Sequence, residues 1–364
     1  MTADTLGGVF TYAIELARAL AGHGVRVALA TMGGPLGASQ RREAEAVPGL
    51  TVIESDYRLE WMDDPWEDLS RAGAWLLGLE QRIRPEIVHV NGFVHAALPF
   101  RAPTVAVAHS CVLSWWSAVR GEEAPPRYDR YRQEVRAGLA AAGAVIAPTR
   151  AMLDAAARYH GPFERSFVIP NAAQAGPRGA VPKENLVLSA GRLWDDAKNV
   201  AALGHVAARL PWPVVALGSD EHPDQGRRSI PGVRALGVLG RAEVTAWMAR
   251  AAIYALPARY EPFGLSALEA ALEGCALVLG DVPSLREVWG DAALFVDPED
   301  PGALERALHL LIEDGDLRRA RALAARTRAL AYTPERMVLR YLEVYDELLE
   351  GARGIEAARE ASCA

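Results

Sequence analysis

Short, almost continuously apolar runs recur along this chain and are separated by longer stretches rich in Ala and Leu. Apolar runs without alternation are typical of parallel strands that are covered on both faces. Helical stretches between such strands build βαβ units. The expected strands form a first series, Val25–Thr31, Glu86–Val90, Thr104–Ala108, Ala144–Ala147 and Ser166–Ile169, and a second series, Asn185–Ser189, Val214–Leu217, Val233–Leu236, Ile253–Leu256, Ala276–Leu279 and Ala293–Val296.

The two series of strands predict two domains of α/β class, each with a parallel Rossmann-like sheet. Between them lies Ala173–Lys183, which has several Pro and Gly residues and no apolar period, as expected of a linker. We therefore expect an N-terminal domain over residues 1–172 and a second domain over 173–331. Two helices have clear ends: Thr11–Ala21 stops at a Gly-His-Gly segment, and Pro334–Glu350 starts with a proline.

The first strand of the N-terminal domain raises a separate question. It should precede the loop at Asp4–Gly8, and only Met1–Ala3 remain to form it. Either the domain lacks most of this strand, or the natural start lies upstream of Met1. A missing central strand would leave two sheet edges unpaired, so the second alternative is our expectation.

Composition narrows the class of protein. A length of 364 residues, 51% of them hydrophobic and 23% charged, fits a globular enzyme of two domains. The net charge of −7 disfavours a nucleic-acid partner, which would need a basic face. The three cysteines are far apart, so neither a disulfide framework nor a zinc site is indicated, and a reducing cytoplasm is expected. No long apolar run or secretory leader is visible, and nothing indicates a peripheral membrane contact.

The segment Arg259–Cys275 carries the strongest chemical signal. It follows a predicted strand, and a helix is expected to run from Gly264 to about Glu273. The first amides of such a helix are unpaired donors at the positive end of a dipole, which suits a phosphate. Glu261 lies in the loop just before the helix.

Glu269 occupies an unusual position on that helix, because it shares the apolar face of Leu265, Leu268 and Leu272. A carboxylate there is costly to bury unless it accepts hydrogen bonds, and the two hydroxyls of a ribose would be suitable donors. The alternative is that Glu269 only flanks the apolar stripe and remains solvated.

A second signal is a strand that ends at Gly191 and is followed by Arg192 and, six residues later, by Lys198. Fixed cations at this position could stabilise the charge that develops on a departing diphosphate without a metal ion. Two solvated surface cations are the alternative interpretation.

Two further candidates follow predicted strands of the N-terminal domain. Gly7 and Gly8 would let the backbone approach a ligand closely, although a tight turn would explain them equally well. His109 follows the strand at 104–108, where open α/β sheets bind ligands; a capping role is the alternative. His89 is interpreted as structural, and the pair Trp115–Trp116 as packing rather than as a stacking platform for an acceptor.

Several familiar motifs are missing or stand in the wrong context. The chain has no G-x-G-x-x-G fingerprint, which disfavours a dinucleotide dehydrogenase, and no P-loop. Asp314-Gly315-Asp316 has the form of a D-x-D metal motif but lies between two helical patterns, as an exposed turn would. Asp195-Asp196 is expected to be a polar loop. We therefore predict no metal site and no cofactor.

In their order and spacing, these segments together resemble glycosyltransferase family 4, which contains retaining enzymes of the GT-B fold. Nearly the whole chain takes part in the resemblance. The matching features are the E-x7-E pair Glu261 and Glu269, the cations Arg192 and Lys198, the pair Gly7-Gly8, His109, the segment VIPNA at 168–172, and the stretch GDVPSLREVWGDAALFVDP at 280–298.

The resemblance implies two Rossmann-like domains facing a central cleft, with residues 332–364 crossing back to the first domain. It also implies metal-independent, retaining transfer of a hexose from a nucleotide diphosphate sugar to a hydroxyl acceptor, which could be a glycan, a lipid-linked molecule or a small molecule. By the same resemblance, His109 faces the transferred sugar, Glu261 contacts it, and Glu269 binds the ribose. The diphosphate is then held by Arg192, Lys198 and the backbone at Phe263, Gly264 and Leu265.

Two other functions remain open on the sequence. A sugar-nucleotide epimerase of the same fold would not require the pair Glu261–Glu269. A catalytically silent nucleotide-sugar-binding protein would be the other, although the presence of both cations and both carboxylates disfavours it.

Overall fold

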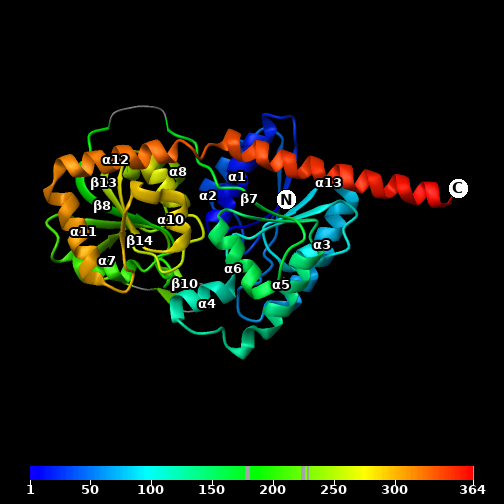
Figure 1. Ribbon diagram of the computed structural model, residues 1–364, viewed down its shortest axis with the longest axis horizontal. Helices are drawn as coiled ribbons and strands as arrows, with labels where there is room; N and C mark the ends of the chain where they lie inside the picture. Colours follow the sequence, from blue (N-terminus) through cyan, green and yellow to red (C-terminus); the bar gives the residue numbers. More distant parts are fainter. Residues whose placement is uncertain (177–180, 223–225, 228, 364) are drawn as a thin grey trace. The chain divides into compact units, whose positions relative to one another are not determined.

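The computed structural model describes residues 1–176, 181–222, 226–227 and 229–363 (Figure 1). The chain forms two compact units. The first contains residues 1–116, 123–171 and 334–364, and the second contains residues 117–122 and 172–333. The expected linker at 173–183 begins just inside the second unit, and its residues 177–180 lie outside the described part of the chain.

Parallel strands of the first unit form two sheets. One has the order β1-β2-β3, and the other has the order β4-β5-β6-β7. The strands are β1 (Thr2–Asp4), β2 (Val27–Met32), β3 (Leu50–Glu54), β4 (Val88–Val90), β5 (Thr104–Val107), β6 (Ala144–Ala147) and β7 (Ser166–Val168).

Asn91, directly after β4, joins the two sheets of this unit. Its backbone amide donates to Thr2 Oγ1 at 2.9 Å, and its side-chain Nδ2 donates to the Thr2 carbonyl oxygen at 2.7 Å. β1 is therefore present as a strand of three residues, paired with β2 on one side and tied to the end of β4 on the other. From β1 the chain continues to β2 on one side, and from β4 it continues to β5 on the other side. A topological switch point therefore lies between β1 and β4.

The second unit contains a single six-stranded parallel sheet of order β12-β9-β8-β13-β14-β15. Its strands are β8 (Glu184–Ala190), β9 (Val214–Leu217), β12 (Val233–Ala235), β13 (Ala251–Leu256), β14 (Ala276–Gly280) and β15 (Leu294–Val296), and a small antiparallel pair, β10 (Glu221–His222) and β11 (Gly226–Arg227), stands apart from it. Because the strand order reverses between β8 and β13, this unit also has a switch point.

Apolar side chains cover both faces of this six-stranded sheet, as the sequence predicted. On β13, Tyr254 and Leu256 join one hydrophobic core, whereas Ile253 and Ala255 join the other. The first core includes residues of α8, α9, α10 and α12, and the second includes residues of α7 and α11 (Figure 1). Such a sheet leaves only the ends of its strands free for polar chemistry.

Helices connect the strands in both units. They are α1 (Gly8–Ala21), α2 (Ala38–Glu45), α3 (Trp66–Ile83), α4 (Val112–Arg120), α5 (Asp129–Ala141), α6 (Arg150–His160), α7 (Val200–Ala207), α8 (Arg241–Arg250), α9 (Leu265–Leu272), α10 (Pro283–Trp289), α11 (Pro301–Glu313), α12 (Gly315–Ala329) and α13 (Pro334–Cys363), with short 3-10 turns η1 (Val94–Ala97), η2 (Pro126–Tyr128) and η3 (Gly290–Ala292).

The last helix, α13, packs on the first unit although it follows the second in sequence. Tyr341 lies against α1, where the Tyr12 hydroxyl donates to the Tyr341 hydroxyl at 2.6 Å. One turn further along, the hydroxyl of Tyr345 is 2.6 Å from Nδ1 of His89. All four side chains are buried, so the helix is fixed by polar contacts inside an otherwise apolar interface.

Every strand expected from an apolar run is present, with ends shifted by two residues at most. The strands that the sequence did not predict are β1, β3, β10 and β11. β1 is only three residues long, and β3 lies at the sheet edge with its side chains partly exposed, so neither forms a continuous apolar run. The final helix extends beyond the expected Glu350.

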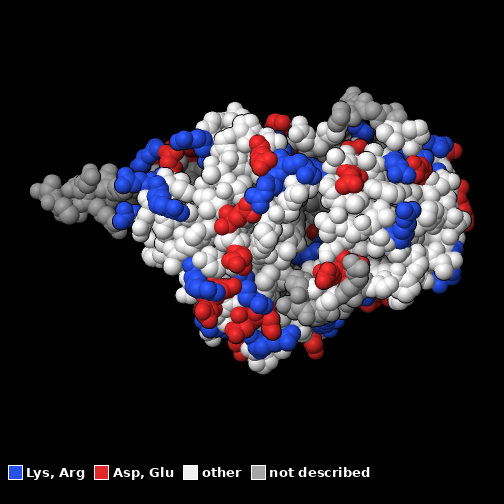
Figure 2. Space-filling view, turned by 180° about the vertical axis from the view of Figure 1, so that it is seen from behind, with Lys and Arg blue, Asp and Glu red and all other residues white. Residues whose placement is uncertain are grey.

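Charged side chains of both signs lie on the surface of the protein. In Figure 2, basic side chains lie among acidic ones on the face shown, rather than forming a continuous field of one sign. Nucleic-acid binding would require a continuous basic field.

None of the helices in the described part of the chain combines the length and apolarity needed to cross a bilayer.

Two helical glycines of the first unit should respond in opposite ways to replacement by alanine. A Cβ at Gly138 in α5 would lie 1.9 Å from the Phe93 carbonyl oxygen, whereas a Cβ at Gly78 in α3 would meet nothing within 4 Å. We expect Gly138→Ala to lower the free energy of unfolding by about 1–3 kcal/mol through overpacking. Gly78→Ala should raise it by about 0.5–1 kcal/mol through helix propensity. Urea unfolding of both variants checks this, and shifts of the same sign would contradict the close approach of α5 to η1.

Candidate functional site

The switch point of the second unit brings together the loops that follow β8 and β13. Gly191 directly follows β8, and Gly218 directly follows the neighbouring β9. Gly218 has φ +125°, and a Cβ on it would lie 1.8 Å from the Gly191 carbonyl oxygen. Only glycine can bring the two strand ends so close, and this contact shapes the loop that carries Arg192 and Lys198.

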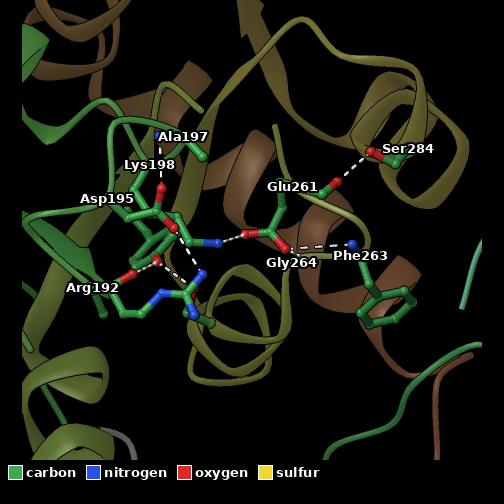
Figure 3. A network of polar contacts seen from close by, with 11 residues as sticks. Arg192, Asp195, Ala197, Lys198, Glu261, Phe263, Gly264 and Ser284 are labelled. Carbon is green, nitrogen blue, oxygen red and sulfur yellow. Dashed lines mark hydrogen bonds and ion pairs between the residues drawn. The ribbon is translucent and has the colours of Figure 1, made fainter. Parts of the chain in front are cut away.

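Lys198 and Glu261 form an ion pair across the switch point, with 2.5 Å between Nζ and Oε2 (Figure 3). The side chain of Lys198 is 17% exposed and that of Glu261 is 10% exposed. Both residues were candidate site residues from the sequence, but the sequence did not predict that they would pair. An ammonium group has three donors, so Lys198 can contact Glu261 and still donate to a ligand.

The second oxygen of Glu261 accepts from backbone amides at the start of α9. The amide of Gly264 is 3.0 Å from Oε1, and that of Phe263 is 3.4 Å from it. The expectation that these amides are free for a phosphate therefore needs correction, because a neighbouring carboxylate already uses them. The hydroxyl of Ser284 in α10 also donates to the backbone carbonyl of Glu261, which fixes the loop further.

Arg192 lies in the loop that follows β8, six residues before Lys198. Its Nη2 donates to Oδ2 of Asp195 at 2.8 Å, and its guanidinium lies 5.3 Å from the centre of the Trp194 ring. Asp195 is only 4% exposed and also accepts from the amide of Ala197 at 3.0 Å. A guanidinium has five N–H donors, so this pairing orients Arg192 and leaves donors for an anion.

Asn199 and Arg259 fasten the two loops to each other. Asn199 adopts a left-handed conformation with φ 53°, and its Nδ2 donates to the carbonyl oxygens of Pro257 and Pro298 at 3.0 and 2.8 Å. Arg259 donates from Nη1 to Asn199 Oδ1 at 2.7 Å and pairs with Glu299. Sequence reasoning missed Asn199 and Asp195 as organising residues, since Asp195 was expected to lie in a polar loop and Asn199 was not singled out.

Glu269 in α9 is neither fully buried nor freely solvated. Its side chain is 25% exposed, and Oε1 lies 3.7 Å from a guanidinium nitrogen of Arg241 in α8. Leu268 and Leu272 are buried, as expected of an apolar stripe. Leu265, the third leucine of the expected stripe, is partly buried. Glu269 thus lies at the border of that stripe and retains access to solvent.

In the first unit, the Gly7-Gly8 pair marks the turn from β1 into α1. Gly7 has an extended conformation as the residue before the helix, and α1 begins at Gly8. The preceding loop is held by Thr5, whose amide donates to Met32 at 3.0 Å and whose carbonyl accepts from Gln40 at 3.0 Å. The backbone at Gly7 therefore lies beyond the carboxyl end of β1, at the start of α1.

His109 is half-buried directly after β5, at the same edge of the sheet as Asn91. Its Nε2 lies 2.8 Å from Asn91 Oδ1, and its ring packs against Tyr12 with 4.5 Å between the centroids. Burial lowers the pKa of His109 well below its ordinary value, so the imidazole is neutral near pH 7. Asn91 could have been found in the sequence by the rule that selected His109, because both directly follow predicted strands.

Asp314 and the two tryptophans Trp115 and Trp116 occupy structural positions in the fold. Asp314 ends α11 and caps α12, where its Oδ1 accepts from the Leu317 amide at 2.8 Å. Trp115 and Trp116 pack against each other with 5.8 Å between ring centroids. Within the described ranges, no group of three or more His, Cys, Asp or Glu side chains is arranged to hold a metal ion.

Two family models match the chain in sequence order. Residues 6–174 match the model described as Glycosyltransferase Family 4, and residues 184–314 match the model described as Glycosyl transferases group 1. These ranges correspond closely to the parts of the two units that carry the sheets.

Similar proteins of established activity are also glycosyltransferases. The chain is 27% identical to the glycogen synthase of Mycobacterium tuberculosis over 89% of its own length and 86% of that protein. It is 32% identical to the O-antigen chain mannosyltransferase B of Escherichia coli, over 38% of its own length and 32% of that protein.

Solved structures establish the fold. The sucrose-phosphate synthase from Thermosynechococcus elongatus superimposes with a TM-score of 0.77 at 19% identity, covering 96% of this chain and 99% of that one. Anabaena Alr3699/HepE, solved in complex with UDP-glucose, gives 0.73 at 17% identity, covering 95% and 99% of the two chains. The family matches, the relatives and the two parallel-sheet units agree: this chain is a glycosyltransferase of the GT-B fold.

Proposed function

We propose that this glycosyltransferase is a retaining, metal-independent enzyme that transfers a hexose from a nucleotide diphosphate sugar to a hydroxyl acceptor in the cytoplasm. The observation that carries the proposal is the pair of oriented cations, Arg192 and Lys198, at the switch point of the second unit. Each is paired with a nearly buried carboxylate, which fixes its position before any ligand arrives.

Breaking the bond between the sugar and the diphosphate leaves negative charge on the phosphate oxygens. Arg192 can offer a planar set of donors to that charge, and Lys198 can offer a point charge beside it. Because Asp195 and Glu261 already hold the two cations, little reorganisation is needed when the charge develops. In this proposal Arg192 and Lys198 take the place that a divalent metal occupies in other transferases.

In this proposal Glu261 acts as a paired carboxylate that positions Lys198, rather than as a free carboxylate. Its two oxygens are engaged by Lys198 and by the amides of Phe263 and Gly264. It can position Lys198 at the diphosphate while its exposed edge contacts the donor sugar. Leu265, at the first position of α9, retains a place at the positive end of the helix dipole.

The proposal also assigns donor contacts to the other candidate residues of both units. Glu269, with solvent access at the border of α9, would accept hydrogen bonds from ribose hydroxyls. The backbone at Gly7 and Gly8 and the side chain of His109 would contact the transferred sugar. A structural neighbour was solved with UDP and with UDP-glucose, which supports a nucleotide-sugar donor for this chain as well.

The first experiment separates the proposed function from its alternatives. The protein is incubated with UDP-glucose or GDP-mannose, with and without a hydroxyl acceptor, and products are followed by proton NMR. Transfer with an unchanged anomeric configuration is the expected result. An epimerised nucleotide sugar would indicate an epimerase, binding without turnover would indicate a silent binding protein, and an inverted product would contradict retention.

Turnover should be independent of divalent metal ions, because the two cations already neutralise the leaving diphosphate. We expect kcat in excess EDTA to stay within about twofold of its value in Mg²⁺ or Mn²⁺, since no metal-dependent step is involved. Loss of turnover in EDTA that is restored by Mg²⁺ or Mn²⁺ would contradict this proposal.

Arg192→Ala and Glu269→Gln should impair different steps. Arg192 meets charge that grows as the bond breaks, so its removal should lower kcat by about a hundredfold or more. The hydrogen bonds of Glu269 to a ribose hardly change between ground and transition state, so its replacement should mainly raise the donor KM. Steady-state kinetics with varied donor measure both constants.

Two control variants match these substitutions. Arg250→Ala removes an arginine that pairs with Glu184 at the opposite edge of the same sheet, and Glu273→Gln changes a glutamate one turn after Glu269. Both controls should leave kcat and donor KM within about twofold of the original protein. An unchanged donor KM in folded Glu269→Gln would refute the ribose contact, and an unchanged kcat in Arg192→Ala would refute the diphosphate contact.

A further inference from the structure

We propose that Asn91 is a positioning residue that holds His109 as the Nε2–H tautomer, so that Nδ1 is presented as a hydrogen-bond acceptor for a hydroxyl of the transferred sugar. The inference deepens the function proposed above and rests on it for the identity of the ligand. The hydrogen-bond geometry around Asn91 carries the argument.

The orientation of the Asn91 amide is fixed by its contact with β1. Nδ2 donates to the carbonyl oxygen of Thr2 at 2.7 Å. If the amide were turned over, its oxygen would face that carbonyl oxygen at the same short distance, which is repulsive. Oδ1 must therefore be the atom that faces the two imidazole rings.

Two imidazoles share this oxygen. Nε2 of His109 lies 2.8 Å from Asn91 Oδ1, and Nε2 of His89 lies 3.1 Å from it. An amide oxygen can only accept, and it has two lone pairs. Both rings must therefore carry their proton on Nε2 when they are neutral.

The helix α13 completes the arrangement on the side of His89. The hydroxyl of Tyr345 lies 2.6 Å from Nδ1 of His89, which in this tautomer is an acceptor. Tyr345 therefore donates to His89, and His89 donates to Asn91. The polar chain that begins on α13 thus reaches Asn91, the residue that orients His109.

His109 differs from His89 in what its second nitrogen contacts. Among the hydrogen bonds of the described residues, the side chain of His109 takes part only through Nε2, and this side chain remains partly exposed. Its Nδ1 lone pair is then available at the ligand-binding edge of the sheet. A lone pair accepts from a hydroxyl and repels a carboxylate, so this position favours a neutral sugar.

The tautomer can be measured directly on the complete protein. We expect nitrogen NMR of 15N-histidine-labelled protein at pH 7.5 to show an unprotonated Nδ1 and a protonated Nε2 for both rings, with His109→Gln and His89→Gln assigning the signals. A protonated Nδ1 on His109, or a doubly protonated ring, would overturn the proposal. This measurement needs no substrate and stands whether or not a sugar donor is found.

Kinetics then test the positioning. Asn91→Leu removes the fixed acceptor, and we expect it to give mixed His109 tautomers. The same variant should lower kcat/KM for the accepted nucleotide sugar by about fivefold to tenfold, the effect of one neutral hydrogen bond. A folded Asn91→Leu protein with unchanged nitrogen shifts or unchanged kcat/KM would refute the positioning role.

Two substitutions on α13 provide a matched pair that leaves Asn91 in place. Tyr345→Phe removes the donor to His89 Nδ1, whereas Tyr341→Phe removes the hydroxyl that accepts from Tyr12. Tyr345→Phe should move the His89 Nδ1 signal more than Tyr341→Phe does, because Tyr341 reaches His89 only through the Tyr12 hydroxyl, which lies 3.4 Å from Nε2. Equal shifts of the Nδ1 signal in both variants would contradict the chain of donors. If no nucleotide sugar is bound or turned over by the original protein, the proposed function fails, while the nitrogen spectra still decide the tautomer.

Discussion

Burial of both faces of each parallel sheet is the constraint on which the rest of this protein depends. In the second unit, the residues of β13 divide between two apolar cores, and β9, β13 and β14 are buried along their whole length. Chemistry must then take place where strands end, and most freely where the strand order reverses. The candidate residues of the second unit lie at such a reversal, between β8 and β13, and those of the first unit follow β1 and β5, on either side of β4.

A second common feature is that charged site residues are already paired. Lys198 is held by Glu261, and Arg192 is held by Asp195, both acids being nearly inaccessible. Burying charges is costly unless they are paired and hydrogen-bonded, and here backbone amides supply additional donors to both carboxylates. The pairs keep the cations in place at a cost to stability that an apolar core would avoid. Such preorganisation is what stabilises charge in a transition state.

In the first unit, neutral hydrogen-bonding groups rather than ion pairs hold the candidate site residues in place. Asn91, His89 and Tyr345 of α13 form a chain of hydrogen bonds without a formal charge, and burial keeps the pKa of His89 well below its ordinary value. Because this chain begins on the last helix and ends at the sheet edge, it connects distant parts of the sequence to one side chain, His109. A network of this kind determines which atoms donate and which accept.

The sequence by itself determined most of the strands, the division into two domains and the positions of Arg192, Lys198, Glu261 and His109, because apolar runs and strand-end positions are local properties of the chain. Only the tertiary structure decided how these residues pair. It joined Lys198 to Glu261, used the amides of Phe263 and Gly264 for that carboxylate, and brought Tyr345 to His89 across 256 positions of sequence. The short strand β1 and the role of Asn91 also needed the fold, since three residues carry too little pattern to predict a strand. Hydrogen bonds depend on distances of a few tenths of an ångström between segments far apart in the chain, and no periodicity in the sequence encodes those distances.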